Sequence, residues 1–191
     1  MKLWYLTHAD VVIDPDVPVT DWGLTDRGRA RHHSFAQRVG GIGSLFCSCE
    51  RKAIEGASII ADAQGLTLHQ VKALHENDRS ATGYLPEPEF EAMADAFFAR
   101  PSENIRGWES AADAQTRIVS TLKDIVSGAP TAGDILVVAH GAVGALLRAH
   151  LLGDSISRSH DQPQGKGGGH VMVIRLPDWT LEQDWTAIEA I

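Results

Sequence analysis

The sequence predicts an α/β fold, a three-layer α/β/α sandwich around a mostly parallel central sheet. Short apolar runs of strand length alternate with longer segments whose apolar residues repeat at helical spacing. Two of these runs, residues 2–6 and 134–139, are each followed closely by a histidine, His8 and His140. Because sites in α/β folds form where parallel strands end, we expect the two imidazoles to lie close together.

The first part of the chain alternates regularly between strands and helices. After the strand at residues 2–6, Thr25 can N-cap a helix from about residue 26 to 39, and Asp26 is favourable in its first turn. The elements expected next are a strand at 44–48, a helix at 50–63 and a strand at 66–74.

A loop-rich excursion is expected at residues 75–107, where prolines and glycines break the alternation and leave a short helix at about 89–99. Excursions of this length often carry lids or substrate contacts. The alternation then resumes with a helix at 111–126, a strand at 135–139, a helix at 142–152, a polar loop at 154–169, and strands at 170–176 and 180–185. Without a repeat or a linker, residues 1–191 are expected to form a single domain.

The composition is that of a globular protein without a basic surface. The 191 residues carry a formal net charge of -8, and no segment is rich in lysine and arginine, so nucleic acid and anionic membranes are excluded as main partners. Cys47 and Cys49 have no other cysteine to pair with, which is typical of a reducing compartment. Because we see neither a signal peptide before Asp10 nor a run that could span a bilayer, we expect a cytoplasmic protein, with a homodimer as the default assembly.

Seven short motifs follow one another along the chain. They are Leu6-Thr7-His8-Ala9, Leu24-Thr25-Asp26-Arg27-Gly28, Ser48-Cys49-Glu50-Arg51-Lys52-Ala53, Leu74-His75-Glu76, Gly107-Trp108-Glu109-Ser110, Val138-Ala139-His140-Gly141 and Gly167-Gly168-Gly169-His170. In this order they resemble the histidine phosphatase superfamily, which has the phosphoglycerate mutase-like fold. Together the motifs are specific for the fold, and less so for the reaction, because members of the family include phosphomonoesterases, mutases and inactive relatives.

The resemblance implies a role for each candidate site residue. His8 would be the nucleophile that takes the phosphoryl group, and Glu76 would protonate the leaving alkoxide. Arg51 would clamp the phosphate, and His140, if protonated, would stabilise the same oxygens. Gly141 would leave room for phosphate near the backbone. Neither a metal nor another cofactor is expected, and the substrate would be a small phosphorylated molecule or a phosphoprotein.

One residue departs from the family pattern. Where the family normally has arginine directly before the nucleophile, this chain has Thr7, whose hydroxyl can donate one hydrogen bond to phosphate but carries no charge. Losing one charge-assisted contact forfeits roughly 1.5–3 kcal/mol, and losing a donor tuned to the transition state costs about 10²–10³ in rate. Arg79 or Lys166 could supply the missing charge.

Three functional alternatives therefore stay open. The first is a phosphomonoesterase-like hydrolase that acts through a phosphohistidine. The second, prompted by Thr7, is a weak or inactive member that binds a phosphate-bearing ligand without turnover. The third is an unrelated α/β protein, in which His8 and His140 would lie far apart.

Each candidate also has a purely structural interpretation. His8 could be a packed histidine at a strand end, Arg51 a solvated side chain on the first turn of a helix, and Glu76 a solvated carboxylate or a cap. Gly56 stands where the family has threonine, which predicts a change in packing rather than in chemistry. Glu109-Ser110 is expected to cap the helix that follows it.

Overall fold

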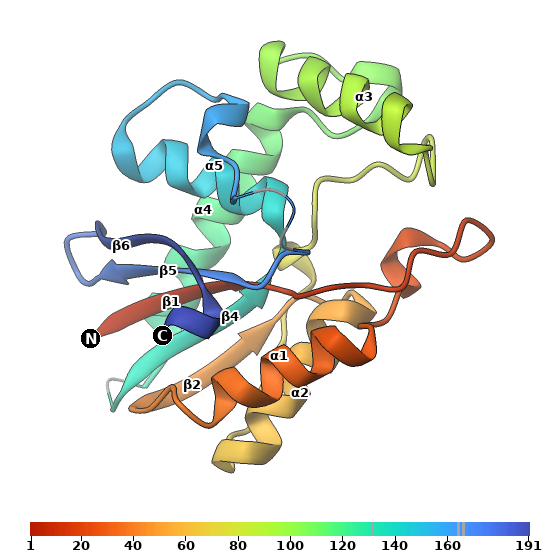
Figure 1. Cartoon of the computed structure of the whole chain (residues 1–191). Coiled ribbons are helices and arrows are strands. Elements are labelled where there is room, and N and C mark those ends of the chain that lie inside the picture. Colours follow the sequence, from red (N-terminus) through yellow and green to blue (C-terminus); the bar gives the residue numbers. More distant parts are fainter. Residues whose placement is uncertain (131, 164, 166) are drawn as a thin grey trace.

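The computed structural model describes residues 1–130, 132–163, 165 and 167–191, and within them six strands form one mixed sheet in the order β3-β2-β4-β1-β5-β6 (Figure 1). Neighbouring strands from β3 to β1 run parallel, whereas β5 and β6 are antiparallel to their neighbours. The strands are β1 (Lys2–Thr7), β2 (Ile42–Cys47), β3 (Leu68–Gln70), β4 (Asp134–Ala139), β5 (His170–Arg175) and β6 (Thr180–Ala187).

Helices cover both faces of the sheet, which confirms the predicted three-layer α/β/α architecture (Figure 1). One face carries α1 (Asp26–Ala36) and α2 (Arg51–Gln64), and the other carries α4 (Ala111–Gly128) and α5 (Gly141–Leu152). The fifth helix, α3 (Glu87–Ala99), lies beyond α4 and α5, farther from the sheet. None of the helices among the described residues combines the length and apolar character needed to cross a membrane.

The sequence of β4 is an unbroken apolar run because both faces of this strand are buried. Ile135, Val137 and Ala139 belong to the core under α4 and α5, whereas Leu136 and Val138 belong to the core under α1 and α2. Successive side chains of a strand point to opposite faces, so a strand covered on both faces must be apolar at every position.

The structure corrects the predicted strand at residues 66–74. Strand β3 is short (Leu68–Gln70), and a 3-10 turn over Lys72–Leu74 follows it. Its only strand partner among the described residues is β2, so it lies at the sheet edge, where pairing ends early. The buried side chain of Leu74 explains the apolar spacing that suggested a longer strand.

The sheet brings the two histidines together at the carboxyl ends of two neighbouring strands. Strands β1 and β4 are parallel neighbours, with Thr7 opposite Ala139. The pairing continues one residue further, because the His8 N–H donates to the Ala139 carbonyl at 3.0 Å. The Tyr5 hydroxyl donates to the His140 carbonyl at 2.9 Å and so ties the start of α5 to β1.

Candidate active site

His8 and His140 face each other at the carboxyl ends of β1 and β4. Their ring centroids are 5.3 Å apart, and the rings are inclined at 67°. The Nδ1 atom of His8 lies 3.0 Å from the Ala9 carbonyl oxygen, so the tautomer with hydrogen on Nδ1 makes this bond. The lone pair on Nε2 is then available to attack an electrophile.

Both imidazoles are neutral near pH 7. Burial lowers the pKa of His8 to about 4, and the charge of Lys52 acts in the same direction. Burial also lowers the pKa of His140 well below its ordinary value, although the charge of Glu50 opposes this shift. The neutral ring is the nucleophilic form of His8, and a neutral His140 can donate one N–H to an anion.

A third histidine, His32 on α1, lies directly behind the first. Its Nε2 accepts the Ala9 N–H at 3.1 Å, so it fixes the backbone next to His8. The ring is fully buried, and burial lowers the pKa of His32 to about 3. A Cβ atom at Gly56 would lie 2.7 Å from this ring, so Gly56 provides the space that His32 fills. Sequence reasoning did not identify this contact, because His32 and Gly56 lie on different helices.

Glu50 and Lys52, at the start of α2, form a buried ion pair beside His140. The Glu50 Oε1 atom accepts the Glu76 N–H at 2.9 Å and lies 3.4 Å from His140 Nε2. The Lys52 ammonium contacts the other Glu50 oxygen and donates to the Val19 carbonyl at 2.8 Å. Burial alone would raise the pKa of Glu50, but His140, Lys52 and the Glu76 N–H lower it to about 2.

The predicted phosphate clamp, Arg51, points away from this pair. Its Nε donates to Glu55 Oε1 at 2.8 Å, and its side chain is 60% exposed. Consecutive helical residues diverge by about 100°. The cation that α2 turns toward the histidines is therefore Lys52, one position further along.

Arg79 and Lys166 are the residues expected to supply the positive charge that Thr7 lacks. Arg79 lines the cavity, and its guanidinium carbon lies 4.9 Å from the ring centroid of Phe90. Its charge contributes to the lowered pKa of His8 and of His140. Lys166 lies outside the described residues.

Thr7 is engaged by a neighbour that sequence reasoning did not identify. Its buried hydroxyl donates to Gln162 Oε1 at 2.7 Å and accepts the His170 N–H at 3.0 Å. A Cβ atom at Gly141 would lie 2.7 Å from Gln162 Nε2. The Gln162 amide thus fills the space between Thr7 and Gly141, and a ligand could reach the Thr7 hydroxyl only by displacing it.

Glu76 connects the candidate site to the first turn of α5. Its carboxylate accepts the Ala142 N–H at 3.2 Å and the Val143 N–H at 3.0 Å. Burial raises the pKa of Glu76, and the charge of Arg79 opposes that shift. A carboxyl group with a raised pKa is suited to donate a proton near neutral pH.

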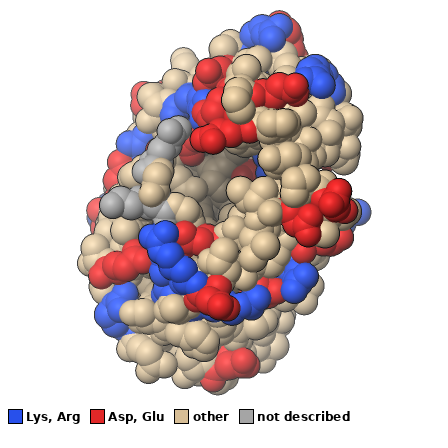
Figure 2. All heavy atoms as spheres, turned by 45° about the vertical axis from the view of Figure 1, so that its right-hand side comes forward, with Lys and Arg blue, Asp and Glu red and all other residues tan. Residues whose placement is uncertain are grey.

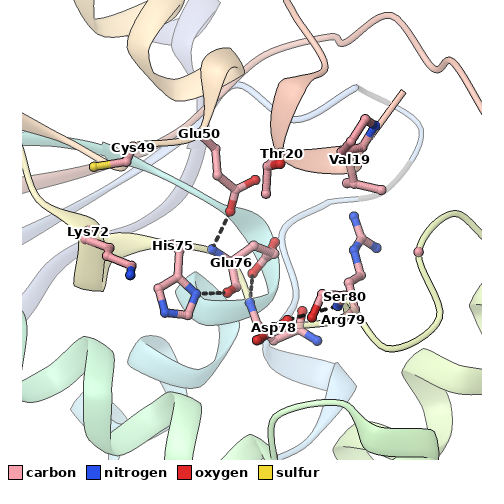
Figure 3. Close-up of a pocket in the computed structure, with 13 residues that line it drawn as sticks. Val19, Thr20, Cys49, Glu50, Lys72, His75, Glu76, Asp78, Arg79 and Ser80 are labelled. Carbon is pink, nitrogen blue, oxygen red and sulfur yellow. Dashed lines mark hydrogen bonds between the residues drawn. The ribbon is translucent and has the colours of Figure 1, made fainter. Parts of the chain in front are cut away.

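A cavity of about 600 Å³ opens beside Glu50 and Glu76. Figure 2 shows a hollow in the face of the molecule, with acidic side chains gathered on its upper rim. In the close-up, the Glu50 carboxylate lies against the backbone of Glu76, while Arg79 extends from the opposite side (Figure 3). The cavity is lined by Pro18, Val19, Thr20, Cys49, Glu50, Lys72, His75, Glu76, Asn77, Asp78, Arg79, Ser80 and Gly83.

In the part of the chain that the structure describes, no group of three or more histidine, cysteine, aspartate or glutamate side chains is placed to hold a metal ion. The two cysteines also differ in their surroundings, because Cys47 is buried in the core and Cys49 is exposed at the cavity.

The buried neutral histidines predict that acid destabilises the fold. His8 and His32 bind protons in the unfolded chain below about pH 6.5, but in the folded chain only near pH 4 and pH 3. The free energy of unfolding should therefore fall as pH falls below 6.5, by up to about 1.4 kcal/mol per pH unit for each group.

Urea unfolding at pH 7, 6 and 5 measures this slope. His32→Gln should flatten it by close to one proton, whereas His33→Gln, a change at the exposed neighbour on α1, should leave it as in the wild type. An unchanged slope in His32→Gln would contradict the neutral, buried state assigned to His32.

Solved structures with the same fold include a mycobacterial glucosyl-3-phosphoglycerate phosphatase with inorganic phosphate, with a TM-score of 0.80 and 20% identity over 98% of both chains. Bacillus stearothermophilus YhfR gives a TM-score of 0.78 and 19% identity, also over 98% of both chains. TTHB049 from Thermus thermophilus gives a TM-score of 0.69 and 18% identity, again over 98% of both chains. At these identities the likeness establishes the fold alone. No curated protein matches the chain in sequence.

The family is established by the sequence itself. The family pattern of the histidine phosphatase superfamily (branch 1) matches residues 16–183, which is most of the chain. The match begins after His8, whose place beside His140 comes from the geometry of β1 and β4. The chain is a member of the histidine phosphatase superfamily.

Proposed function

We propose that this protein hydrolyses phosphate monoesters of a small molecule through a phosphohistidine at His8. The observation that carries the proposal is the neutral His8 ring, held through Nδ1 and facing His140. The cavity that adjoins Glu50 and Glu76 is of a size that suits a small phosphorylated substrate. One of the similar structures is a phosphatase of a small phosphorylated molecule, glucosyl-3-phosphoglycerate, which agrees with this substrate class.

The reaction proceeds in two steps. His8 Nε2 attacks phosphorus, the N–P bond forms, and the P–O bond to the leaving group breaks with its electron pair on oxygen. Glu76 gives its proton to that oxygen. In the second step Glu76 takes a proton from water, the water oxygen attacks phosphorus, and the N–P bond breaks to release inorganic phosphate and neutral His8.

Charge stabilisation in this site is modest. The transferring group spreads its negative charge over three oxygens, which cationic groups stabilise. The described cations that act on His8 are Lys52, already paired with Glu50, and Arg79. We therefore expect slow turnover compared with a site that presents two free arginines.

A second candidate function is ligand binding without turnover. The observation that favours it is the engagement of the groups expected to bind phosphate. The Thr7 hydroxyl is occupied by Gln162, and Arg51 is held by Glu55. A binder of this kind would retain affinity for a phosphate-bearing ligand and show no turnover above background.

The Glu76→Gln variant tests the proposed acid. Glutamine cannot donate a carboxyl proton, so kcat should fall by about 10²–10⁴ with an alkyl phosphate, whose leaving group needs protonation. The loss should be much smaller with p-nitrophenyl phosphate, because nitrophenolate leaves without a proton.

Steady-state rates with the two substrates provide the measurement. Glu87→Gln, an exposed change on α3 that removes the same charge, should leave both rates unchanged. If Glu76→Gln lowered kcat by the same factor with both substrates, that result would contradict the assignment of Glu76 as the proton donor.

A further inference from the structure

The Glu50 carboxylate is unusual because it lies in the region where a phosphatase would need positive charge. Its side chain is 8% exposed and that of Lys52 is 4% exposed, so both charges are largely removed from water. Glu50 also lines the cavity, and its Oε1 atom lies 3.4 Å from His140 Nε2. An anion that approaches this side of His140 therefore meets a resident carboxylate.

The positive charge around Glu50 and the two histidines does not balance a doubly charged ligand. Lys52 from α2 is neutralised by Glu50 itself, and the rings of His8 and His140 are neutral. Glu76, from the loop after β3, adds a second carboxyl group to the same region. The other described cations that line the cavity are Arg79, whose charge acts on both histidines, and the exposed Lys72.

Glu50 cannot readily relieve this conflict by taking up a proton. Its Oε1 accepts the Glu76 N–H, and its other oxygen is paired with Lys52, and both contacts favour the ionised form. The same contacts help to hold the pKa of Glu50 at about 2. The carboxylate thus keeps its charge throughout the neutral range. Like charges a few ångström apart in a partly buried site repel strongly, and the repulsion doubles for a doubly charged ligand.

We infer that Glu50 is a specificity-determining residue, which makes the anion position beside His140 select singly charged phosphoryl groups over doubly charged ones. The inference rests on the proposed function, because it concerns the charge of the group presented to His8. Substrates of this class are phosphate esters that carry one negative charge at the reacting phosphorus. They are phosphate monoesters whose second charge is removed by protonation.

Anion binding at fixed pH tests this inference without any chemistry at phosphorus. Sulfate is doubly charged and methanesulfonate singly charged near pH 7.5, and the two are similar in size. In Glu50→Gln we expect sulfate affinity to rise by at least about tenfold and methanesulfonate affinity to rise by less than about threefold, measured by titration calorimetry. Asp62→Asn removes the same charge from an exposed position on α2 and should change neither affinity.

The wild-type protein supplies a second readout if Glu50→Gln does not fold. It should bind methanesulfonate more tightly than sulfate by about tenfold or more. Equal gains for the two anions in Glu50→Gln, an equal gain in Asp62→Asn, or a wild-type preference for sulfate would each overturn the inference, as would the absence of binding to both proteins.

The role of Glu50 in anion binding and the phosphatase activity can each fail while the other holds. His8-dependent turnover with unchanged sulfate affinity in Glu50→Gln would retain the phosphatase and remove the role of Glu50. A selective gain of sulfate binding in Glu50→Gln, in a protein without turnover, would retain the role of Glu50 in anion binding and remove the phosphatase.

Discussion

Replacing His8 by alanine is expected to reduce phosphatase activity to background while leaving the fold intact. In the proposed mechanism His8 supplies the Nε2 lone pair that attacks phosphorus, and the other two imidazoles of the site have different roles. His140 is its partner across the site, and His32 has its Nε2 occupied by the Ala9 N–H. Loss of a nucleophile typically costs 10³-fold or more in kcat, roughly the difference between catalysis and background.

Turnover of p-nitrophenyl phosphate by metal-free protein measures the effect. His33→Ala, at an exposed position on α1, serves as the matched control and should keep wild-type activity. Substantial activity in His8→Ala, with a thermal midpoint close to that of the wild type, would contradict the nucleophile assignment.

Replacing Lys52 by methionine is expected to give the largest loss of stability among single changes in the site. The variant leaves the Glu50 carboxylate buried without its cationic partner. Breaking a buried pair by removing one partner costs about 3–5 kcal/mol, because the remaining charge is uncompensated. The hydrogen bond from Lys52 to the Val19 carbonyl, which anchors the chain segment at the cavity, is lost as well.

Urea unfolding at pH 7 measures this loss of stability, and two further variants identify its cause. Lys123→Met changes an exposed lysine on α4 and should alter the free energy of unfolding by no more than about 0.5 kcal/mol. The double variant Glu50→Gln/Lys52→Met removes both charges and should recover most of the lost stability. A double variant as unstable as Lys52→Met would show that the stability effect comes from packing of the lysine stem.

The fold could be predicted from the sequence because its signals are local. Strand-length apolar runs alternate with segments of helical spacing, and Thr25 and Ser110 mark the starts of two helices, so that most of the elements are defined locally. Thr25 accepts the Gly28 N–H at 3.0 Å, as its position before a helix predicts. Ser110 likewise caps α4 by accepting the Asp113 N–H at 3.1 Å. The length of β3 was mispredicted because edge pairing is decided by the neighbouring strand rather than by the local pattern.

The approach of His8 to His140 could also be predicted, because it depends only on two parallel strands that end at the same level. The side chain that faces them from α2 could not be placed as easily. Arg51 and Lys52 are adjacent cations, and a motif of this kind does not define the rotation of the helix. The structure turns Lys52 inward and leaves Arg51 with Glu55.

The remaining site contacts are long-range and leave no local pattern. Gln162 reaches Thr7 from a loop more than 150 positions away, and His32 fills space left by Gly56 on another helix. Such pairs are recognised only when the backbone positions of both elements are known. The contact with His32 shows that Gly56 affects packing behind His8 rather than chemistry, as predicted from the sequence.

The most direct test of the proposed mechanism is to locate the phosphoryl group during turnover. Wild-type protein is mixed with p-nitrophenyl phosphate, quenched rapidly at alkaline pH and digested, and its peptides are mapped by mass spectrometry. The proposed mechanism predicts a phosphoryl group on His8 in the wild type, accumulating further where hydrolysis of the intermediate is slowed, and none in His8→Ala. Turnover without phosphorylated His8, or a phosphoryl group on another residue such as Cys49, would contradict it.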